Sequence, residues 1–187
     1  MSFNNLGLSF ELKKSIEDKG YTNPSDVQLQ AIPSILKGND IMAGAQTGTG
    51  KTAAFALPIL QRLQNDESKR RRVRALVLVP TRELAAQVGD SFRDYGNNLR
   101  FRTSTLFGGV NINTQINKLR KGVDIVVATP GRLLDHLNQK TLDLSELEVF
   151  VLDEADRMLD MGFIRDIKKV LKYLPKKKQN LLFSATF

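Results

Sequence analysis

Short apolar runs alternate with longer amphipathic segments along most of this 187-residue chain. Runs such as ALVLV, IVVA and VFVL are apolar on consecutive positions, which is typical of strands buried on both faces. We predict six strands, at residues 40–43, 75–79, 102–106, 124–128, 149–152 and 180–183. Helical spacing of apolar residues predicts helices at residues 51–64, 82–95, 111–120, 131–138 and 163–173. The alternation predicts an α/β fold of three layers, with a mainly parallel sheet sandwiched between helices.

Residues 1–39 carry a different pattern, with two helical segments at 9–19 and 25–36. We predict that they form a helical N-terminal segment packed on a core domain of residues 40–187. Pro58 lies inside the helical pattern of 51–64, and we expect it to kink that helix or end its regular part early.

Composition excludes several classes of site. The chain has no cysteine, which excludes a disulfide scaffold, a thiolate zinc site and cysteine catalysis. His136 is the single histidine and is expected to be structural or exposed. The longest apolar run has eight residues, 53–60, whereas a membrane-spanning helix needs roughly 20. The N-terminus does not resemble a signal peptide, so we expect a cytoplasmic protein without a membrane partner.

The net charge is +8, and the excess lies after residue 68. A basic balance favours polyanionic partners but is a weak indication by itself. The basic runs at 69–74 and 173–178 are interpreted as solvated faces or linkers.

The sequence AQTGTGKT follows the first strand and precedes a helix, as in the phosphate-binding loop GxxxxGK[ST], although alanine replaces the first glycine. The glycines allow backbone N–H groups to point at phosphate oxygens, and the helix N-terminus adds partial positive charge. Lysine can reach the β and γ phosphates and threonine can ligate Mg²⁺. The alternative is a Gly-rich helix start with a solvated lysine. The predicted nucleotide-binding residues are Ala45, Gln46, Thr47, Gly48, Thr49, Gly50, Lys51 and Thr52.

A second motif, VFVLDEAD, is acidic and follows from the strand at 149–152. The strand would bring Asp153 to the carboxyl edge of the sheet, where it could hold Mg²⁺ through water together with Thr52. Glu154 would position or deprotonate an attacking water. An acid-rich helix N-terminus is the alternative. With Lys51 upstream, the pair favours NTP hydrolysis, with Lys51, Asp153 and Glu154 as catalytic residues.

Three polar loops each follow a predicted strand end and should therefore share one edge of the sheet. Their hydroxyls, glycine N–H groups and arginines suit a sugar–phosphate backbone without base reading. Turn formation and helix capping would explain the same residues without any RNA, and the sequence alone leaves both interpretations open. The loops consist of Pro80, Thr81, Arg82 and Glu83, of Gly108 and Gly109, and of Thr129, Pro130, Gly131 and Arg132.

These motifs together resemble the DEAD-box family of ATP-dependent RNA helicases, most closely its bacterial RhlE-like members. AQTGTGKT and DEAD are joined in the family's order by PTRELA, GG, TPGR and SAT, and GYTNPSDVQ is similar to the family's Q motif. The resemblance covers essentially the whole chain. It implies the first of two RecA-like domains, with the second domain, including its arginine fingers, as the missing partner in cis.

The resemblance also implies roles. ATP and Mg²⁺ would be bound, with Gln28 reading adenine, Tyr21 stacking on the base and Phe3 assisting. An amide has a donor and an acceptor for adenine N6 and N7, whereas guanine offers two acceptors. RNA would lie on the three loops. Asp156 would be hydrogen-bonded by Ser184 and Thr186, which would couple nucleotide state to RNA grip.

The resemblance implies an RNA-dependent ATPase that opens short RNA duplexes or remodels RNA–protein complexes. The chain alone is expected to bind nucleotide but hydrolyse it poorly, because an arginine finger contributes ~10³–10⁵ in rate. Two alternatives remain open: a nucleotide- and RNA-binding module without catalysis, and another P-loop enzyme such as a small-molecule kinase or GTPase. Gln28 and the SAT segment argue against the latter.

Overall fold

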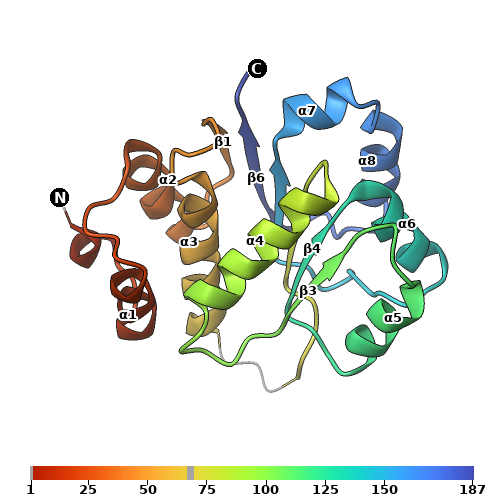
Figure 1. The fold of residues 1–187 in the computed structure, drawn as a ribbon, viewed down its shortest axis with the longest axis horizontal. Helices are drawn as coiled ribbons and strands as arrows, with labels where there is room; N and C mark the ends of the chain where they lie inside the picture. Colours follow the sequence, from red (N-terminus) through yellow and green to blue (C-terminus); the bar gives the residue numbers. More distant parts are fainter. Residues whose placement is uncertain (1, 67–69) are drawn as a thin grey trace.

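A single parallel sheet forms the centre of the molecule (Figure 1). The computed structural model describes residues 2–66 and 70–187. In this part of the chain the strands follow the order β1-β6-β5-β2-β4-β3, and every neighbouring pair is parallel. The strands are β1 (Ile41–Gly44), β2 (Ala75–Leu78), β3 (Thr103–Leu106), β4 (Ile125–Ala128), β5 (Val149–Asp153) and β6 (Gln179–Ser184).

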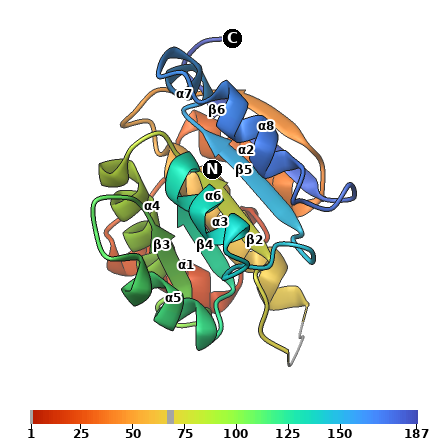
Figure 2. The same cartoon turned by 90° about the vertical axis from the view of Figure 1, so that its right-hand side faces the viewer.

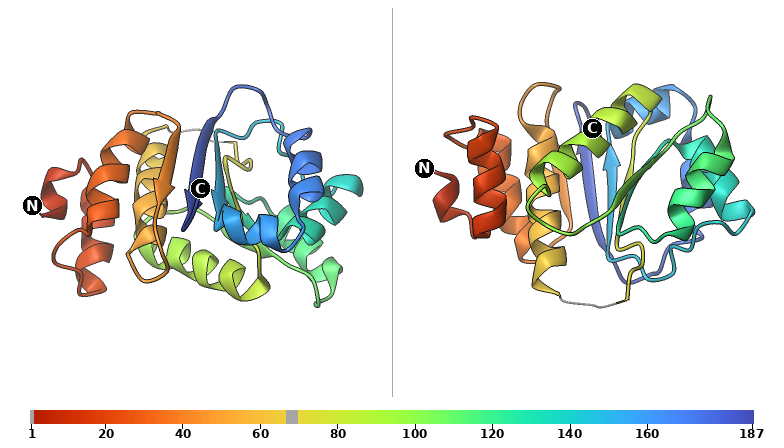
Figure 3. Two further views of the ribbon diagram at one scale, coloured as in Figure 1. Left: turned by 90° about the horizontal axis from the view of Figure 1, so that it is seen from above. Right: turned by 60° about the horizontal axis from the view of Figure 1, so that its bottom comes forward.

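Helices cover both faces of the sheet, which confirms the predicted three-layer α/β fold (Figures 2 and 3). On one side lie α1 (Phe10–Asp18), α2 (Asp26–Leu36), α3 (Lys51–Asn65) and α4 (Arg82–Tyr95). On the other side lie α5 (Ile112–Arg120), α6 (Pro130–Asn138) and α8 (Ile164–Leu171), while the short α7 (Ala155–Asp160) follows β5.

Successive residues of a strand enter different cores, because side chains alternate between the two faces. Val77 belongs to the core shared with α3 and α4, whereas Leu76 and Leu78 belong to the core shared with α6 and α8. All three side chains are fully buried. Double burial therefore explains why these strands are apolar on consecutive positions.

The N-terminal helices extend the first of these cores. A short 3-10 helix, η1 (Phe3–Asn5), precedes α1. Leu12 of α1 and Ile32 of α2 are fully buried in the same cluster as Phe55 of α3. The division into segments 1–39 and 40–187 stays a prediction.

Two helical predictions are corrected. Pro58 does not end its helix, because α3 continues to Asn65. A proline inside a helix costs about 3 kcal/mol, and here the burial of most side chains of α3 outweighs that cost. The second correction is α7, which was not predicted: it has only six residues and begins after Glu154, a residue that lacks a capping hydrogen bond from its side chain.

The basic run at 69–74 is only partly the solvated face or linker that we predicted, since Arg70 is exposed but Arg74 is not. Lys69 lies outside the described residues, but Arg74 is buried and its guanidinium contacts Glu148 and Asp66. Arg71 pairs with Asp124. These arginines fasten the strands at the edge opposite the motif loops, and they are therefore structural.

Among the residues that the structure describes, no helix is both long enough and apolar enough to cross a membrane.

Candidate functional site

The strand order separates the motif loops into two groups along one edge of the sheet. Strands β1, β6 and β5 are neighbours, and they lead into the phosphate loop, SAT and DEAD. Strands β2, β4 and β3 are neighbours, and they lead into PTRE, TPGR and the glycine pair. All strands are parallel, so the loops lie at the same carboxyl edge, where α/β proteins bind ligands.

The phosphate loop has the backbone conformation that its glycines predict. Gly48 and Gly50 have φ of +88° and +80°, in the left-handed region that glycine adopts without strain. Gly50 is the N-cap of α3 and offers no side chain to cover the first-turn N–H groups, which makes that turn suitable for an anion. The loop is tied down at Ala45, whose N–H donates to the Ser184 carbonyl at 3.1 Å, and at Thr49, whose hydroxyl donates to the Gln46 carbonyl at 2.6 Å.

The first residue of α3 meets the last residue of β5. Lys51 Nζ lies 2.8 Å from Asp153 Oδ1, and both side chains are buried, with exposed fractions of 6% and 0%. Burial raises the pKa of Asp153, and the Lys51 ammonium opposes that shift. In the described part of the chain, the carboxylate oxygens of Asp153 have no well-formed hydrogen bond besides the contact with the Lys51 ammonium. A buried carboxylate with unused lone pairs is suited to a cation or to a water bound by one.

Glu154 is held beside this pair by an unusual backbone. Its φ of +55° places a non-glycine residue in the left-handed region, which costs roughly 1–2 kcal/mol. One carboxylate oxygen lies 3.9 Å from Lys51 Nζ and the other 4.0 Å from Arg157 Nη1.

A cavity of about 550 Å³ lies over the loop and Glu154. Its walls include residues 47–52 and the predicted Phe3, Tyr21 and Gln28. Sequence reasoning missed Lys19, Gln87, Ser91 and Tyr95, which line it too.

Tyr95 is the most informative of these missed residues. Burial raises the pKa of Tyr95. The neighbouring Tyr21 raises it further, through electrostatic repulsion and through a side-chain hydrogen bond. Lys19 lies over the Tyr95 ring, with Nζ 4.7 Å from its centroid. The end of α4 therefore forms the part of the cavity wall next to Tyr21. Tyr95 lies outside every motif, so motif spacing does not reveal this contact.

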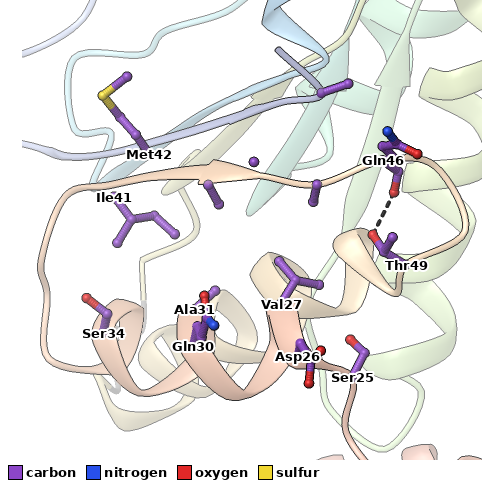
Figure 4. A pocket seen from close by; sticks show the side chains of 14 residues that line it. Ser25, Asp26, Val27, Gln30, Ala31, Ser34, Ile41, Met42, Gln46 and Thr49 are labelled. Carbon is purple, nitrogen blue, oxygen red and sulfur yellow. Dashed lines mark hydrogen bonds between the residues drawn. The ribbon is translucent and has the colours of Figure 1, made fainter. Parts of the chain in front are cut away.

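A larger hollow, of about 840 Å³, lies between α2 and strand β1 (Figure 4). The predicted residues Ala45 and Gln46 border this hollow rather than the smaller cavity, and Thr49 borders both. Lys51, Asp153 and Glu154 are not among its lining residues. Lys51 and Glu154 line the smaller cavity instead.

Gln28 connects the N-terminal helices to the phosphate loop. Its Oε1 accepts a hydrogen bond from the N–H of Ser25 at 3.0 Å, and its Nε2 donates to the Gly50 carbonyl at 3.0 Å. The amide still has one donor and one acceptor position, which are the two that adenine requires. The hydrogen bond between Ser25 and Gln28 belongs to a capping box, a pattern that the letters SDVQ already contain.

The other half of the edge contains arginines with different surroundings. Arg82 is exposed and its guanidinium carbon lies 5.2 Å from the Phe107 ring centroid. Thr81 caps α4, while Pro80 is buried and Glu83 exposed. Arg132 is only 12% exposed at its side chain, and both of its Nη atoms donate to the Val110 carbonyl at 3.1 Å.

The remaining predicted residues of this half differ in their exposure. Gly109 has φ of +82°, so it occupies a turn that favours glycine. Gly131 is exposed, whereas Gly108 and Thr129 are half-buried and Pro130, the first residue of α6, is buried.

The predicted contacts of Asp156 are confirmed. Its N–H donates to Ser184 Oγ at 3.2 Å, and Thr186 Oγ1 donates to Asp156 Oδ2 at 3.1 Å. These bonds join the start of α7 to the end of β6.

Comparison with known proteins agrees with this geometry. A family model described as DEAD/DEAH box helicase matches residues 25–187. The DEAD-box ATP-dependent RNA helicase RhpA of Helicobacter pylori is 48% identical over 185 residues, covering 99% of this chain and 37% of the relative. The DEAD-box ATP-dependent RNA helicase CshA of Bacillus cereus is 49% identical over 185 residues, covering 99% and 35%. CshA of Streptococcus pneumoniae is 46% identical over 186 residues, covering 100% and 35%. The chain thus spans about a third of the length of these curated relatives.

Proposed function

Because the chain belongs to the DEAD/DEAH box helicase family, we propose that it is the ATP- and RNA-binding first RecA-like domain of an ATP-dependent RNA helicase. The observation that carries the proposal is the buried contact of 2.8 Å between Lys51 and Asp153 below the phosphate loop. It joins the phosphate-binding and acidic motifs in one cavity, although they lie about a hundred residues apart in the sequence.

Lys51 serves two partners in this proposal. It pairs with Asp153 in the structure, and it lies at the helix start where the β and γ phosphates of ATP would be held. When Lys51 turns to the phosphates, the buried Asp153 carboxylate needs another positive partner, because an unpaired buried charge is costly.

We propose Mg²⁺ as that partner, held by Thr52 and Asp153. Once Lys51 has turned away, the Asp153 carboxylate would have no other partner, and its oxygens would fit a cation or the water bound to it. The metal ion supplies neutralisation of phosphate charge when it is bound. Glu154, held at the edge of the cavity by its left-handed backbone, orients the attacking water and accepts its proton.

For the base, Gln28 presents its remaining donor and acceptor to adenine, and Tyr21 provides the stacking face. Tyr21 is 46% exposed, so its ring is accessible. Phe3 is buried in the core beneath the cavity and supports the wall. Guanine offers acceptors at both corresponding positions, so the amide would favour ATP over GTP.

RNA binds, in this proposal, across the ends of β2, β4 and β3. The loops there present Arg82, Thr81, glycine N–H groups and Thr129, which suit backbone phosphates without reading bases. The hydrogen bonds between Asp156, Ser184 and Thr186 couple the nucleotide-binding loops to RNA binding in this proposal. The product would be local opening of short duplexes or remodelling of RNA–protein complexes.

A second RecA-like domain in cis completes the enzyme in this proposal. The longer length of the relatives supports it. Without that domain's arginine fingers, the 187-residue chain alone would bind nucleotide and turn it over poorly. The assignment to the RhlE-like group stays a proposal, since the relatives named here are RhpA and CshA.

The test is Glu154→Gln in the full-length protein, which keeps the side-chain shape and removes the base. We expect loss of RNA-stimulated ATP turnover with ATP binding retained. Glu17→Gln, at an exposed position on α1 away from the cavity and the predicted RNA loops, is the matched control. Normal turnover by the Glu154 variant would defeat the assignment.

A further inference from the structure

We propose that Gln115 and His136 are positioning residues that lock the glycine loop and the TPGR helix into one unit. The inference rests on the proposed function, because it assigns these loops to RNA. Neither residue belongs to a motif singled out by the sequence, and both are buried polar side chains on the helices that follow β3 and β4.

Gln115 lies at the centre of the contacts. It is 6% exposed, and its Nε2 donates to the Phe107 carbonyl at 3.0 Å. Its Oε1 accepts from Arg132 Nη1 at 3.2 Å and lies 2.9 Å from His136 Nε2. One amide therefore bridges the loop, through Phe107, to two side chains of α6.

The partners determine which way this amide faces. A backbone carbonyl only accepts, so the amide nitrogen must face Phe107. A guanidinium only donates, so the amide oxygen must face Arg132, and His136 must carry its proton on Nε2. Nδ1 of His136 lies 2.9 Å from the Thr141 hydroxyl, whose single proton also faces the His136 carbonyl at 3.1 Å. Gln115 thus has a partner at both ends of its amide, and a neutral imidazole with its proton on Nε2 is compatible with these contacts.

The loop is consequently held on both sides of its glycines. Gln115 holds the carbonyl of Phe107, and Arg132 holds the carbonyl of Val110 with both Nη atoms. Gly108 and Gly109 lie between these two anchors. A glycine pair has high conformational freedom, and RNA that bound an unanchored loop would have to order it at a cost in affinity.

The geometry also changes the role of Arg132. Its guanidinium is engaged with Val110 and Gln115, and Nε lies 3.5 Å from Asp135. It acts on RNA through the loop that it holds, whereas the exposed Arg82 is free to meet a phosphate directly.

The experiment measures RNA-stimulated ATP turnover by the full-length protein with Gln115→Met and, separately, His136→Leu. We expect the KM for RNA to rise about tenfold, the size of one or two lost hydrogen bonds, with kcat at saturating RNA and the KM for ATP unchanged. His136→Gln keeps an N–H donor for Gln115 and should restore the KM to within about twofold of wild type.

Gln179→Met is the matched control. Gln179 is 5% exposed and donates to the carbonyls of Ile35 and Asn39, away from the RNA loops. Its variant should lose stability as Gln115→Met does, without a change in the KM for RNA. A wild-type KM in both Gln115→Met and His136→Leu, or an equal rise in Gln179→Met, would overturn the inference. Wild-type turnover that does not respond to RNA would instead reject the proposed function.

Discussion

The side-chain amide of Gln28 donates a hydrogen bond to the backbone carbonyl of Gly50, across 22 residues of sequence. The phosphate loop is therefore held from the side of α2 as well as by its own turn. A Cβ atom on Gly50 would collide with Gln28 Nε2 and displace that side chain, so a larger residue would disturb this contact as well as the backbone, whose φ is +80°.

We expect Gly50→Ala to weaken ATP binding by at least about tenfold. The left-handed backbone would cost roughly 1–2 kcal/mol, and Gln28 would be displaced from both the loop and the base. Titration calorimetry with a non-hydrolysable ATP analogue measures the effect. Gly131→Ala, where the added atom meets open space, is the control and should bind normally. Equal affinities for wild type and Gly50→Ala would show that the Gln28 contact is dispensable.

Lys51→Met should destabilise the fold as well as abolish turnover. It leaves the fully buried Asp153 carboxylate without its positive partner, and breaking a buried pair costs about 3–5 kcal/mol. Adding Asp153→Asn to Lys51→Met removes the stranded charge and should recover most of the loss. Urea unfolding of the two single variants and the double variant completes the cycle. If the double variant were as unstable as the sum of the singles, the two groups would not be energetically coupled.

Most of the fold could be predicted from the sequence because the central strands β2, β4 and β5 are buried on both faces and are continuous apolar runs. The predicted strand bounds agree with the observed ones to within one residue, as at residues 149–152 against Val149–Asp153. The order of the strands in the sheet could not be predicted in this way. Placing β6 between β1 and β5 depends on contacts between distant segments, which local patterns do not contain.

The same distinction separates the site residues that were found from those that were missed. Lys51 and Glu154 lie in local motifs, so spacing found them. Tyr95 enters the cavity from the end of α4, and the acid partners of Arg74 come from two other parts of the chain. The basic run was misinterpreted for this reason: sequence shows that charges are grouped, while only the fold shows which opposite charges meet them.

Ser184→Ala should separate ATP turnover from RNA remodelling. Ser184 Oγ accepts from the N–H of Asp156 and donates to the Thr186 carbonyl at 2.6 Å, so its loss loosens the link between β6 and α7. Each lost hydrogen bond is worth about 1 kcal/mol, and we expect duplex opening per ATP to fall about fivefold or more. Strand separation and phosphate release are measured on the same sample. Ser145→Ala, in an exposed loop, is the control, and unchanged opening per ATP in Ser184→Ala would remove Ser184 from the coupling route.

His136 should make the stability of the domain sensitive to mild acid. Burial lowers the pKa of His136 below its usual 6.5, the nearby Arg132 lowers it further, and Asp135 opposes this. The folded state thus binds a proton less readily than the unfolded state. The stabilisation from neutral His136 is fully present above pH 6.5 and is lost as the pH falls from there through the folded pKa. Melting temperatures from pH 8 to pH 5 should therefore fall more steeply for wild type than for His136→Gln, which has no titrating group at this position. Parallel curves for the two proteins would mean that His136 is not the group that is protonated on unfolding in this range.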